Sequence, residues 1–305
     1  MDKECMQMNI TSAGSGYDNP VFGVGHNCFN VIHVTAIVCL LLSLSSAVGV
    51  IILLYKSRAE KSFMKGRKHE RFLLYRCICD ISYSFVHTSD HAQTLITEDH
   101  VRPSGLCTLY AMLIVITCIS ETLFSLASAF NAFLSVYFRK NVNFGNKDWK
   151  LILLLGVRPF LVVVIMTSLH VFGPNGFFCA FDSVKGVTAN AVMSTGFTSA
   201  ILVANTTFYV LTWYRIYTET KELKTQLDKK GSTRRATLKS AKAMCLFVVV
   251  YIIQWTPLSV NGTWQLISDV PFGLFLAVVI ITNLSGVFSG TICLFNRSNR
   301  ISVSN

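Results

Sequence analysis

Seven stretches of mostly apolar residues follow one another along the chain, and polar segments separate them. Each is long enough, at about 20 residues or more, to cross the hydrocarbon core of a bilayer as a helix. The pattern therefore predicts an all-α membrane protein built as a seven-helix bundle, with an N-terminal segment over residues 1–29 and a short tail over 296–305. The expected helices span residues 30–55, 71–97, 106–138, 150–172, 191–217, 241–263 and 272–295.

Composition agrees with a lipid environment. Of the 305 residues, 52% are hydrophobic and only 14% are charged, whereas soluble domains carry about 25% charged residues. The net charge of +11 does not indicate a nucleic-acid partner, because the basic residues are concentrated in loops between the apolar stretches. Residues 1–29 lack the apolar core of a cleavable signal peptide, so we expect the first helix to act as the targeting signal.

The distribution of Lys and Arg predicts the orientation in the membrane. Most of them lie in the tail and in the loops after the first, third and fifth stretches, where the first of these loops is counted together with the start of the second helix, which holds Arg71 and Arg76. The other side of the membrane receives only Lys3, Arg102 and Lys185. Cytoplasmic loops carry the excess of positive charge, so we expect the N-terminus outside and the C-terminus inside.

The cysteines divide in a way that fits this orientation. Six of the ten fall inside apolar stretches, where they are expected to pack as small apolar residues. The other four, Cys5, Cys28, Cys107 and Cys179, fall on the outer side, where an oxidising environment favours disulfides. Asn9 begins an Asn-Ile-Thr acceptor for glycosylation on the same side.

The third and sixth stretches resemble those of a known superfamily. The third is unusually long, has Cys107 at its outer end and closes in the basic pair Arg139-Lys140, and the sixth contains Gln254-Trp255-Thr256-Pro257. Together with the seven helices, these features resemble the G-protein-coupled receptor superfamily over nearly the whole chain.

The resemblance implies both partners and site residues. It implies an extracellular ligand, a heterotrimeric G protein and a place in the plasma membrane, and it pairs Cys107 with Cys179 so that the loop between helices four and five is fixed over the bundle mouth. Apart from the resemblance, the position of Cys5 and Cys28 on the outer side makes them a candidate pair for a second disulfide. Trp255 and Pro257 correspond to the activation switch, since Pro257 removes one helix hydrogen bond and permits a kink.

Two acidic residues fall inside the predicted membrane core. Asp80 matches the sodium-site aspartate of the superfamily, and Glu121 falls at the third-helix position that faces it. Buried carboxylates are costly in a membrane and are usually functional, and two close together do not both ionise freely. The resemblance therefore predicts that the pair shares a proton or a cation. The alternative is that Glu121 is protonated and packs against another helix.

The second helix carries a polar stripe. Asp80, Ser84, His87 and His91 are spaced so that they share one face, which is expected to face the bundle interior. His87, Asp90 and His91 lie towards the outer end and are candidates for the wall of a ligand pocket, while the alternative is a network of interhelical hydrogen bonds. We predict no metal site, because His87 and His91 have no identifiable third ligand, and we predict no cofactor.

The loop after the fifth helix contains Arg234-Arg235-Ala236-Thr237. Two arginines before a threonine resemble the target of a basophilic kinase, which makes Thr237 a candidate phosphorylation site. The alternative is a basic loop beside anionic lipid, and the two interpretations are compatible.

Other positions depart from the superfamily. The Asp-Arg-Tyr motif at the end of helix three is replaced by Asn131-Ala132-Phe133, and the Asn-Pro-x-x-Tyr motif of helix seven is absent. Helix one lacks the usual Asn, and helix four has Arg158-Pro159 where a Trp is expected. The chain thus resembles a divergent member at the rhodopsin-like or cyclic-AMP-receptor-like edge, without the residues that usually hold the inactive state.

These observations favour a receptor that transduces an extracellular signal. The alternatives are a seven-helix transporter and a non-signalling membrane protein. A transporter is disfavoured because no internal repeat is evident in the sequence. A retinal-binding opsin is disfavoured because Gly273 to Phe295 contains no Lys for a Schiff base. An enzyme is not expected, since there is no His-rich metal set, nucleophile elbow or P-loop.

Overall fold

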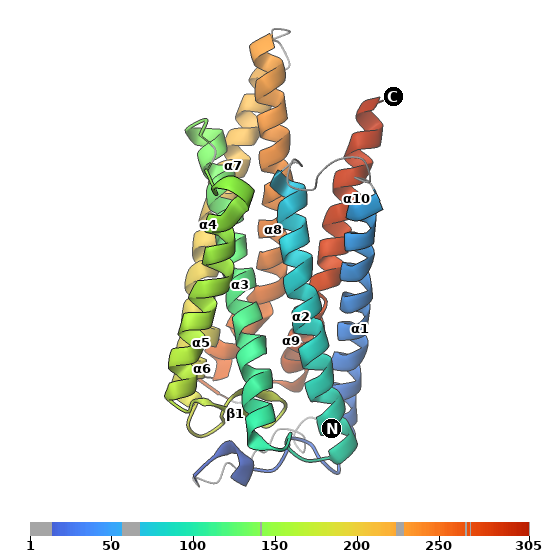
Figure 1. Ribbon diagram of the computed structural model, residues 1–305, viewed down its shortest axis with the longest axis vertical. Helices are drawn as coiled ribbons and strands as arrows, with labels where there is room; N and C mark the ends of the chain where they lie inside the picture. The colour runs from blue at the N-terminus through green and yellow to red at the C-terminus, as the bar shows by residue number, and fades with distance from the viewer. Residues whose placement is uncertain are drawn as a thin grey trace.

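A computed structural model describes residues 14–56, 68–140, 142–223, 229–265, 267–268 and 270–304. Long helices run side by side in a bundle over these residues (Figure 1). The three unbroken helices of the N-terminal half are α1 (Asn27–Lys56), α2 (Lys68–Thr97) and α3 (Ser104–Tyr137). Two strands, β1 (Phe172–Pro174) and β2 (Cys179–Phe181), form an antiparallel hairpin at one end of the bundle.

The remaining helices are longer or more broken than the apolar pattern indicates. The fourth is assembled from η3 (Asn146–Asp148), α4 (Trp149–Ile152), the π-helical segment η4 (Leu153–Val157) and α5 (Arg158–Ser168). The fifth joins α6 (Val187–Asn190), the π-helical η5 (Ala191–Phe197) and α7 (Thr198–Leu223). The sixth is α8 (Lys229–Gln265), and the seventh is α9 (Phe272–Asn283) followed by α10 (Ser285–Ser304).

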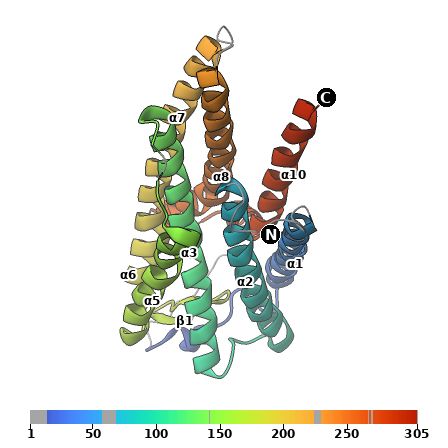
Figure 2. The same cartoon turned by 45° about the horizontal axis from the view of Figure 1, so that its top comes forward.

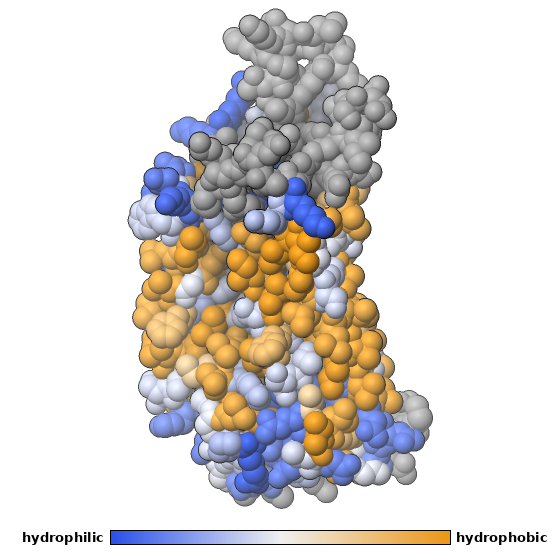
Figure 3. Space-filling model, turned by 45° about the vertical axis from the view of Figure 1, so that its right-hand side comes forward, coloured by the Kyte–Doolittle hydropathy of each residue, from blue (hydrophilic) through white to orange (hydrophobic). Residues whose placement is uncertain are grey.

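The seven-helix bundle that the sequence predicts is confirmed, since each predicted stretch forms a helix. In the described part of the chain, five helices are long and apolar enough to cross a membrane, and α9 with α10 makes a sixth when the bent pair is one span. The remaining one, α2, carries Arg76, Asp80 and Asp90 along its length. The visible surface has an apolar band across its middle and hydrophilic residues below it (Figure 3), as lipid surroundings require.

Helix α3 is the centre of the bundle. It contacts α2, α5, α7 and α8 as well as both strands. Its buried face contains many small residues, among them Ser125, Ser128, Ala129 and Ala132, which let neighbouring backbones approach closely in a membrane bundle. Its bounds lie within two residues of the predicted ones, because no Gly or Pro interrupts the sequence after Gly105.

The break in the fourth helix follows from Pro159. Proline has no N–H, so the carbonyl of Leu155, four residues earlier, loses its normal helical donor. The chain widens into the π-helical η4 just before this point, and the hydroxyl of Ser120 on α3 donates to the Leu155 carbonyl at 2.6 Å. The proline therefore joins two helices, because α3 supplies the hydrogen bond that it removes.

The seventh helix bends by 52° between α9 and α10 without a proline. The bend leaves the backbone N–H of Gly286 outside the regular helix, and the hydroxyl of Ser43 on α1 accepts it at 2.7 Å. A Cβ atom at Gly286 would lie 2.2 Å from the backbone oxygen of Ser43, so only glycine permits this approach. Ser43 is fully buried and thus joins α1 to the bend.

Two terms are used below for the ends of the bundle. The disulfide end is the one that carries the β1–β2 hairpin and the bridge from Cys107 to Cys179, at the bottom of Figure 1. The opposite end carries the last turns of α3 and α7 and the first turns of α8. There α7 and α8 lie side by side in both orientations of the ribbon (Figures 1 and 2).

Candidate functional site

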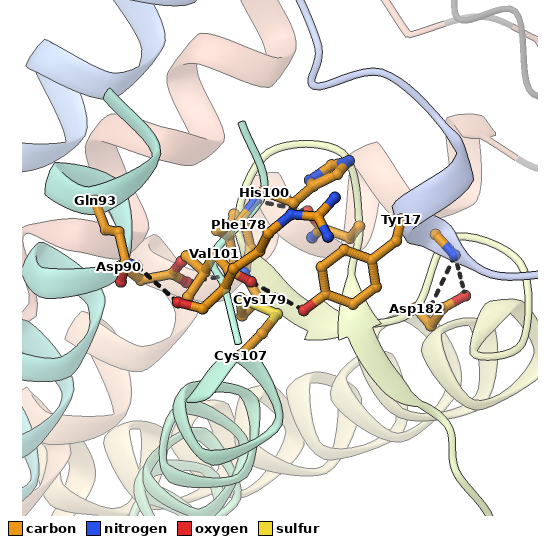
Figure 4. The surroundings of a disulfide bond; sticks show 12 residues. Tyr17, Asp90, Gln93, His100, Val101, Cys107, Phe178, Cys179 and Asp182 are labelled. Carbon is orange, nitrogen blue, oxygen red and sulfur yellow. Dashed lines mark hydrogen bonds between the residues drawn. A yellow bond between two sulfur atoms is a disulfide. The ribbon is translucent and has the colours of Figure 1, made fainter. Parts of the chain in front are cut away.

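The disulfide end is closed by the hairpin. Cys107, in the first turn of α3, is bridged to Cys179 on β2, which confirms the predicted pairing. The backbone N–H of Cys179 also donates to Oδ2 of Asp90 at 2.8 Å, and Figure 4 shows both attachments together. Asp90 thus anchors the loop. This differs from its predicted place in the wall of a ligand pocket, because it does not line the cavity described below. The second predicted pair includes Cys5, which lies outside the described residues.

The segment over residues 14–26 packs on the outer side of this hairpin. The carboxylate of Asp182 accepts the N–H of Gly16 at 2.9 and 3.0 Å, and the hydroxyl of Tyr17 donates to the carbonyl of Val101 at 3.0 Å. Burial raises the pKa of Tyr17 from its ordinary value, which is consistent with its hydroxyl acting as a donor here. The ring of Phe22 lies 4.6 Å from that of Phe177. These contacts hold residues 14–26 against the disulfide end of the bundle.

We expect the loss of the bridge to lower the amount of protein at the cell surface. Removing a native disulfide typically costs about 2–5 kcal/mol in small domains, and the hairpin of this chain would keep the bond to Asp90 and its contacts with residues 14–26 but lose its covalent link to α3. Cys107→Ala, Cys179→Ala and the double variant should all be reduced to a similar level in antibody staining of intact cells.

Cys39→Ala is the matched control, because Cys39 is a buried free cysteine of α1. It should retain near-normal surface levels. A double variant much worse than either single variant would show that the two cysteines act independently and would contradict a shared role.

A cavity of about 300 Å³ lies on the side of the hairpin that faces the bundle interior. His87 and His91 of α2 line it. The ring of Phe178, in the turn of the hairpin, lies 4.7 Å from the ring of His87 and 5.6 Å from that of His91. Trp255 and Asn261 of α8 form part of the facing wall. Asn261 begins a glycosylation motif in the sequence, but its side chain is buried in this wall. The π-helical η5 turns additional polar residues towards the same space.

The histidines form a row that begins outside the cavity. Nδ1 of His91 lies 2.8 Å from Nδ1 of His33 on α1, and the rings of His87 and His91 are 4.5 Å apart. Within the described chain, no group of three or more His, Cys, Asp or Glu side chains has the arrangement of a metal site. The row is therefore a packed polar contact between α1 and α2 whose inner members face the cavity.

A network of buried polar groups lies next to the cavity, further from the disulfide end. The guanidinium of Arg76 donates to Ser289 of α10 at 3.1 Å and to Oε1 of Gln254 on α8 at 2.8 Å. Ser289 donates to Asp80 at 2.5 Å, and the Gln254 amide donates to Glu121 at 3.4 Å. Asp80 and Glu121 are also direct neighbours. The structure thus brings the two predicted carboxylates together around one arginine.

Arg76 was counted among the inner-side charges at the start of the second helix. Its side chain is only 1% exposed and lies in the bundle core. The physical reason is the two carboxylates, which make the core favourable for a guanidinium. A signal existed in the sequence, because Arg76 and Asp80 are four residues apart and share a helix face.

The opposite end is held by a second arginine. Arg234 of α8 forms an ion pair with Glu219 of α7 and donates to the backbone carbonyls of Ser135 and Val136 at the end of α3, at 3.2 and 2.8 Å. Helix α3 itself has no arginine at the expected motif. The contact between the helices is therefore made from α8 towards α3, and sequence reasoning did not find it.

The remaining predicted residues are placed as follows. Asn131, which stands in the motif position of the missing acid, accepts the backbone N–H of Val142 at 3.1 Å and so holds the loop after α3. Thr237 lies inside α8 and is half-buried. Pro257 lies inside the same helix, three residues after Gln254. Asn9 lies outside the described residues.

Among solved structures, 525 chains match this fold, one of which is the crystal structure of squid rhodopsin. The match has a TM-score of 0.67 and covers 87% of this chain and 80% of the other. The chain has the rhodopsin fold. At 13% sequence identity, the likeness is one of architecture, namely a multi-span helical membrane protein with the fold of a receptor.

No family model matches the chain, and no curated protein matches it either. The rhodopsin fold is thus recognised from the arrangement of the helices, while the residues that occupy its functional positions differ. The seventh helix, for example, has no lysine between Gly273 and Phe295.

Proposed function

We propose that this chain is a plasma-membrane receptor that binds an extracellular small molecule in the cavity and transmits the signal to a heterotrimeric G protein. The disulfide end would face outwards and the opposite end would face the cytoplasm, as the positive-inside distribution of Lys and Arg favours. The rhodopsin fold supports a receptor in general, and the proposal adds the direction of signalling and the partner.

The observation that supports this proposal most directly is that the single helix α8 contributes to three sites. Trp255 lines the cavity, the adjacent Gln254 belongs to the polar network, and Arg234 holds α3 at the opposite end. Trp255 and Arg234 are separated by about 30 Å along a helix, at 1.5 Å per residue. A ligand that displaces Trp255 would therefore act on the same rigid element that holds the opposite end closed, and receptors switch by biasing two such packings.

Within this proposal, Asp80 and Glu121 share a single proton. One guanidinium facing two carboxylates leaves one negative charge, and a shared proton would neutralise it. Arg76 already supplies the fixed cation that the pair requires, which favours a proton over a sodium ion as the additional charge.

Thr237 remains a proposed phosphorylation site. It lies three residues after Arg234 in α8, so a phosphate there would compete with Glu219 for the guanidinium. Modification would then loosen the contact with α3 and change coupling.

The proposal is tested by measuring basal signalling, that is, signalling without added agonist, in cells that carry reporters for each second messenger. Wild type is expected to differ from empty vector in at least one reporter, and Trp255→Ala should change that difference at equal surface expression. Silence in every reporter, together with solute flux across the membrane, would favour the transporter alternative instead.

A further inference from the structure

The cavity holds polar atoms that have no partner in the described protein. Nδ1 of His87, Nε1 of Trp255 and Oδ1 of Asn261 are buried without a hydrogen bond, and each of these side chains is more than nine-tenths buried. All three residues line the cavity. Buried polar atoms in native proteins almost always find a partner, so a molecule bound in the cavity is expected to supply one.

The cavity wall also lacks ionised side chains. None of the described residues that line it is Asp, Glu, Lys or Arg. Asp90 is held by Cys179, and Glu121 by Gln254. A cationic ligand would find no carboxylate here, and an anionic ligand would find no guanidinium or ammonium group. Burying an unpaired charge is far more costly than burying a neutral polar group.

The histidines do not alter this conclusion. The contact of 2.8 Å between Nδ1 of His33 and Nδ1 of His91 requires one of the nitrogens to accept, so the two rings cannot both be fully protonated. His33 and His91 therefore do not carry two positive charges at the same time.

The apolar part of the lining is rich in aromatic rings. Phe177 stacks on Phe275 at 4.4 Å, and both line the cavity with Phe178, Phe181 and Trp255. Ring faces of this kind favour flat apolar groups, and a mostly apolar wall with a few polar atoms is typical of small-molecule sites.

We propose that the ligand of this cavity is an uncharged small molecule with a flat apolar body, a hydrogen-bond acceptor for Trp255 and a donor for Asn261. The proposal rests on the proposed receptor function, since it identifies the class of molecule that the receptor would detect. Trp255 Nε1 is a donor and Asn261 Oδ1 is an acceptor, and a primary amide carries both complementary groups, an oxygen for the first and an NH₂ group for the second. His87 Nδ1 provides a third polar contact.

Three probes of nearly equal size separate the classes of charge. They are 2-(2-naphthyl)acetamide, which is neutral, 2-naphthylacetate, which is its anionic isostere, and 2-(2-naphthyl)ethylammonium, which is cationic. Binding to the purified full-length chain is measured by equilibrium dialysis. The amide is expected to bind at least about tenfold more tightly than either charged probe. A charged probe that binds as tightly as the amide, or no binding of the amide, would overturn the proposal.

Two variants test the named atoms. Trp255→Phe keeps an aromatic ring but removes the donor, and it should weaken amide binding by about two- to tenfold. Asn261→Asp introduces a carboxylate of the same shape, and it should improve binding of the ammonium probe by at least about tenfold. Asn30→Asp adds the same charge at an exposed site on α1 outside the cavity and should change nothing. Equal responses of Asn261→Asp and Asn30→Asp would count against this cavity as the site.

The binding experiment contains no G protein, so the two proposals fail separately. Selective amide binding without any reporter signal would leave the ligand class standing and remove the coupling. A reporter signal in cells combined with a preference for a charged probe would do the reverse.

Discussion

Arg76→Met is expected to destabilise the bundle by about 3–5 kcal/mol, the usual result of removing one partner from a buried set of charges. Arg76 is buried and joins Asp80 to Glu121 through Ser289 and Gln254. Without the guanidinium, the two carboxylates would be neighbours with no fixed positive charge between them. The measurement is the thermal unfolding midpoint of detergent-solubilised protein, with the yield of monodisperse protein as a second readout.

A triple variant tests whether charge is the cause. Arg76→Met combined with Asp80→Asn and Glu121→Gln removes all three charges while keeping similar shapes, and it should recover much of the lost stability. Such recovery means that the effects are not additive, as expected for groups in one network. If the triple variant were as unstable as the sum of the single variants, Arg76 would matter for packing alone.

Arg158→Met is the matched control for Arg76. Arg158 also lies within a membrane-spanning stretch, but its side chain is exposed on the fourth helix. Its replacement should leave the unfolding midpoint unchanged or raise it, because no buried carboxylate depends on it. A similar loss in both arginine variants would indicate a general effect of positive charge rather than a role for the network.

Arg234→Ala is expected to raise basal signalling about 10- to 100-fold. Hydrogen bonds to a charged group contribute about 1.5–3 kcal/mol, and losing them shifts a two-state equilibrium by a corresponding factor. Arg234 binds Glu219 and the carbonyls of Ser135 and Val136, so its removal loosens the attachment of α8 to α3 and α7 at the opposite end. Basal second-messenger output, divided by surface expression, is the readout, and its ceiling is the fully active state.

Glu219→Gln should raise basal output in the same direction, and the double variant should do little more than Arg234→Ala alone. Lys221→Ala is the control, since Lys221 is an exposed basic residue at the same end of α7. Lower basal output in Arg234→Ala at normal surface expression would show that Arg234 serves the active state and would contradict its role as a lock.

The class of fold and the approximate course of its helices follow from the order of apolar and polar residues alone. Apolar stretches of membrane-spanning length can be read along the chain, because each must bury its own backbone hydrogen bonds and match the bilayer thickness. The pairing of Cys107 with Cys179 was also predicted and is confirmed. His87 and His91 were placed on the interior face correctly, because helical spacing reports which residues share a face.

The tertiary structure decided which polar groups meet. Arg76 and Ser289 are 213 residues apart, and Arg234 and Val136 are 98 apart, so no local pattern connects them. Helical periodicity shows the face on which a side chain lies, but not which neighbour it meets or how far a long arginine reaches across the bundle. The same holds for Asp90, which was expected in a pocket wall with the histidines at the outer end of helix two, whereas its carboxylate accepts the backbone N–H of Cys179. The partners of buried charges were thus set by the packing of helices that are remote in sequence, because only that packing supplies the low-dielectric surroundings in which such charges must be paired.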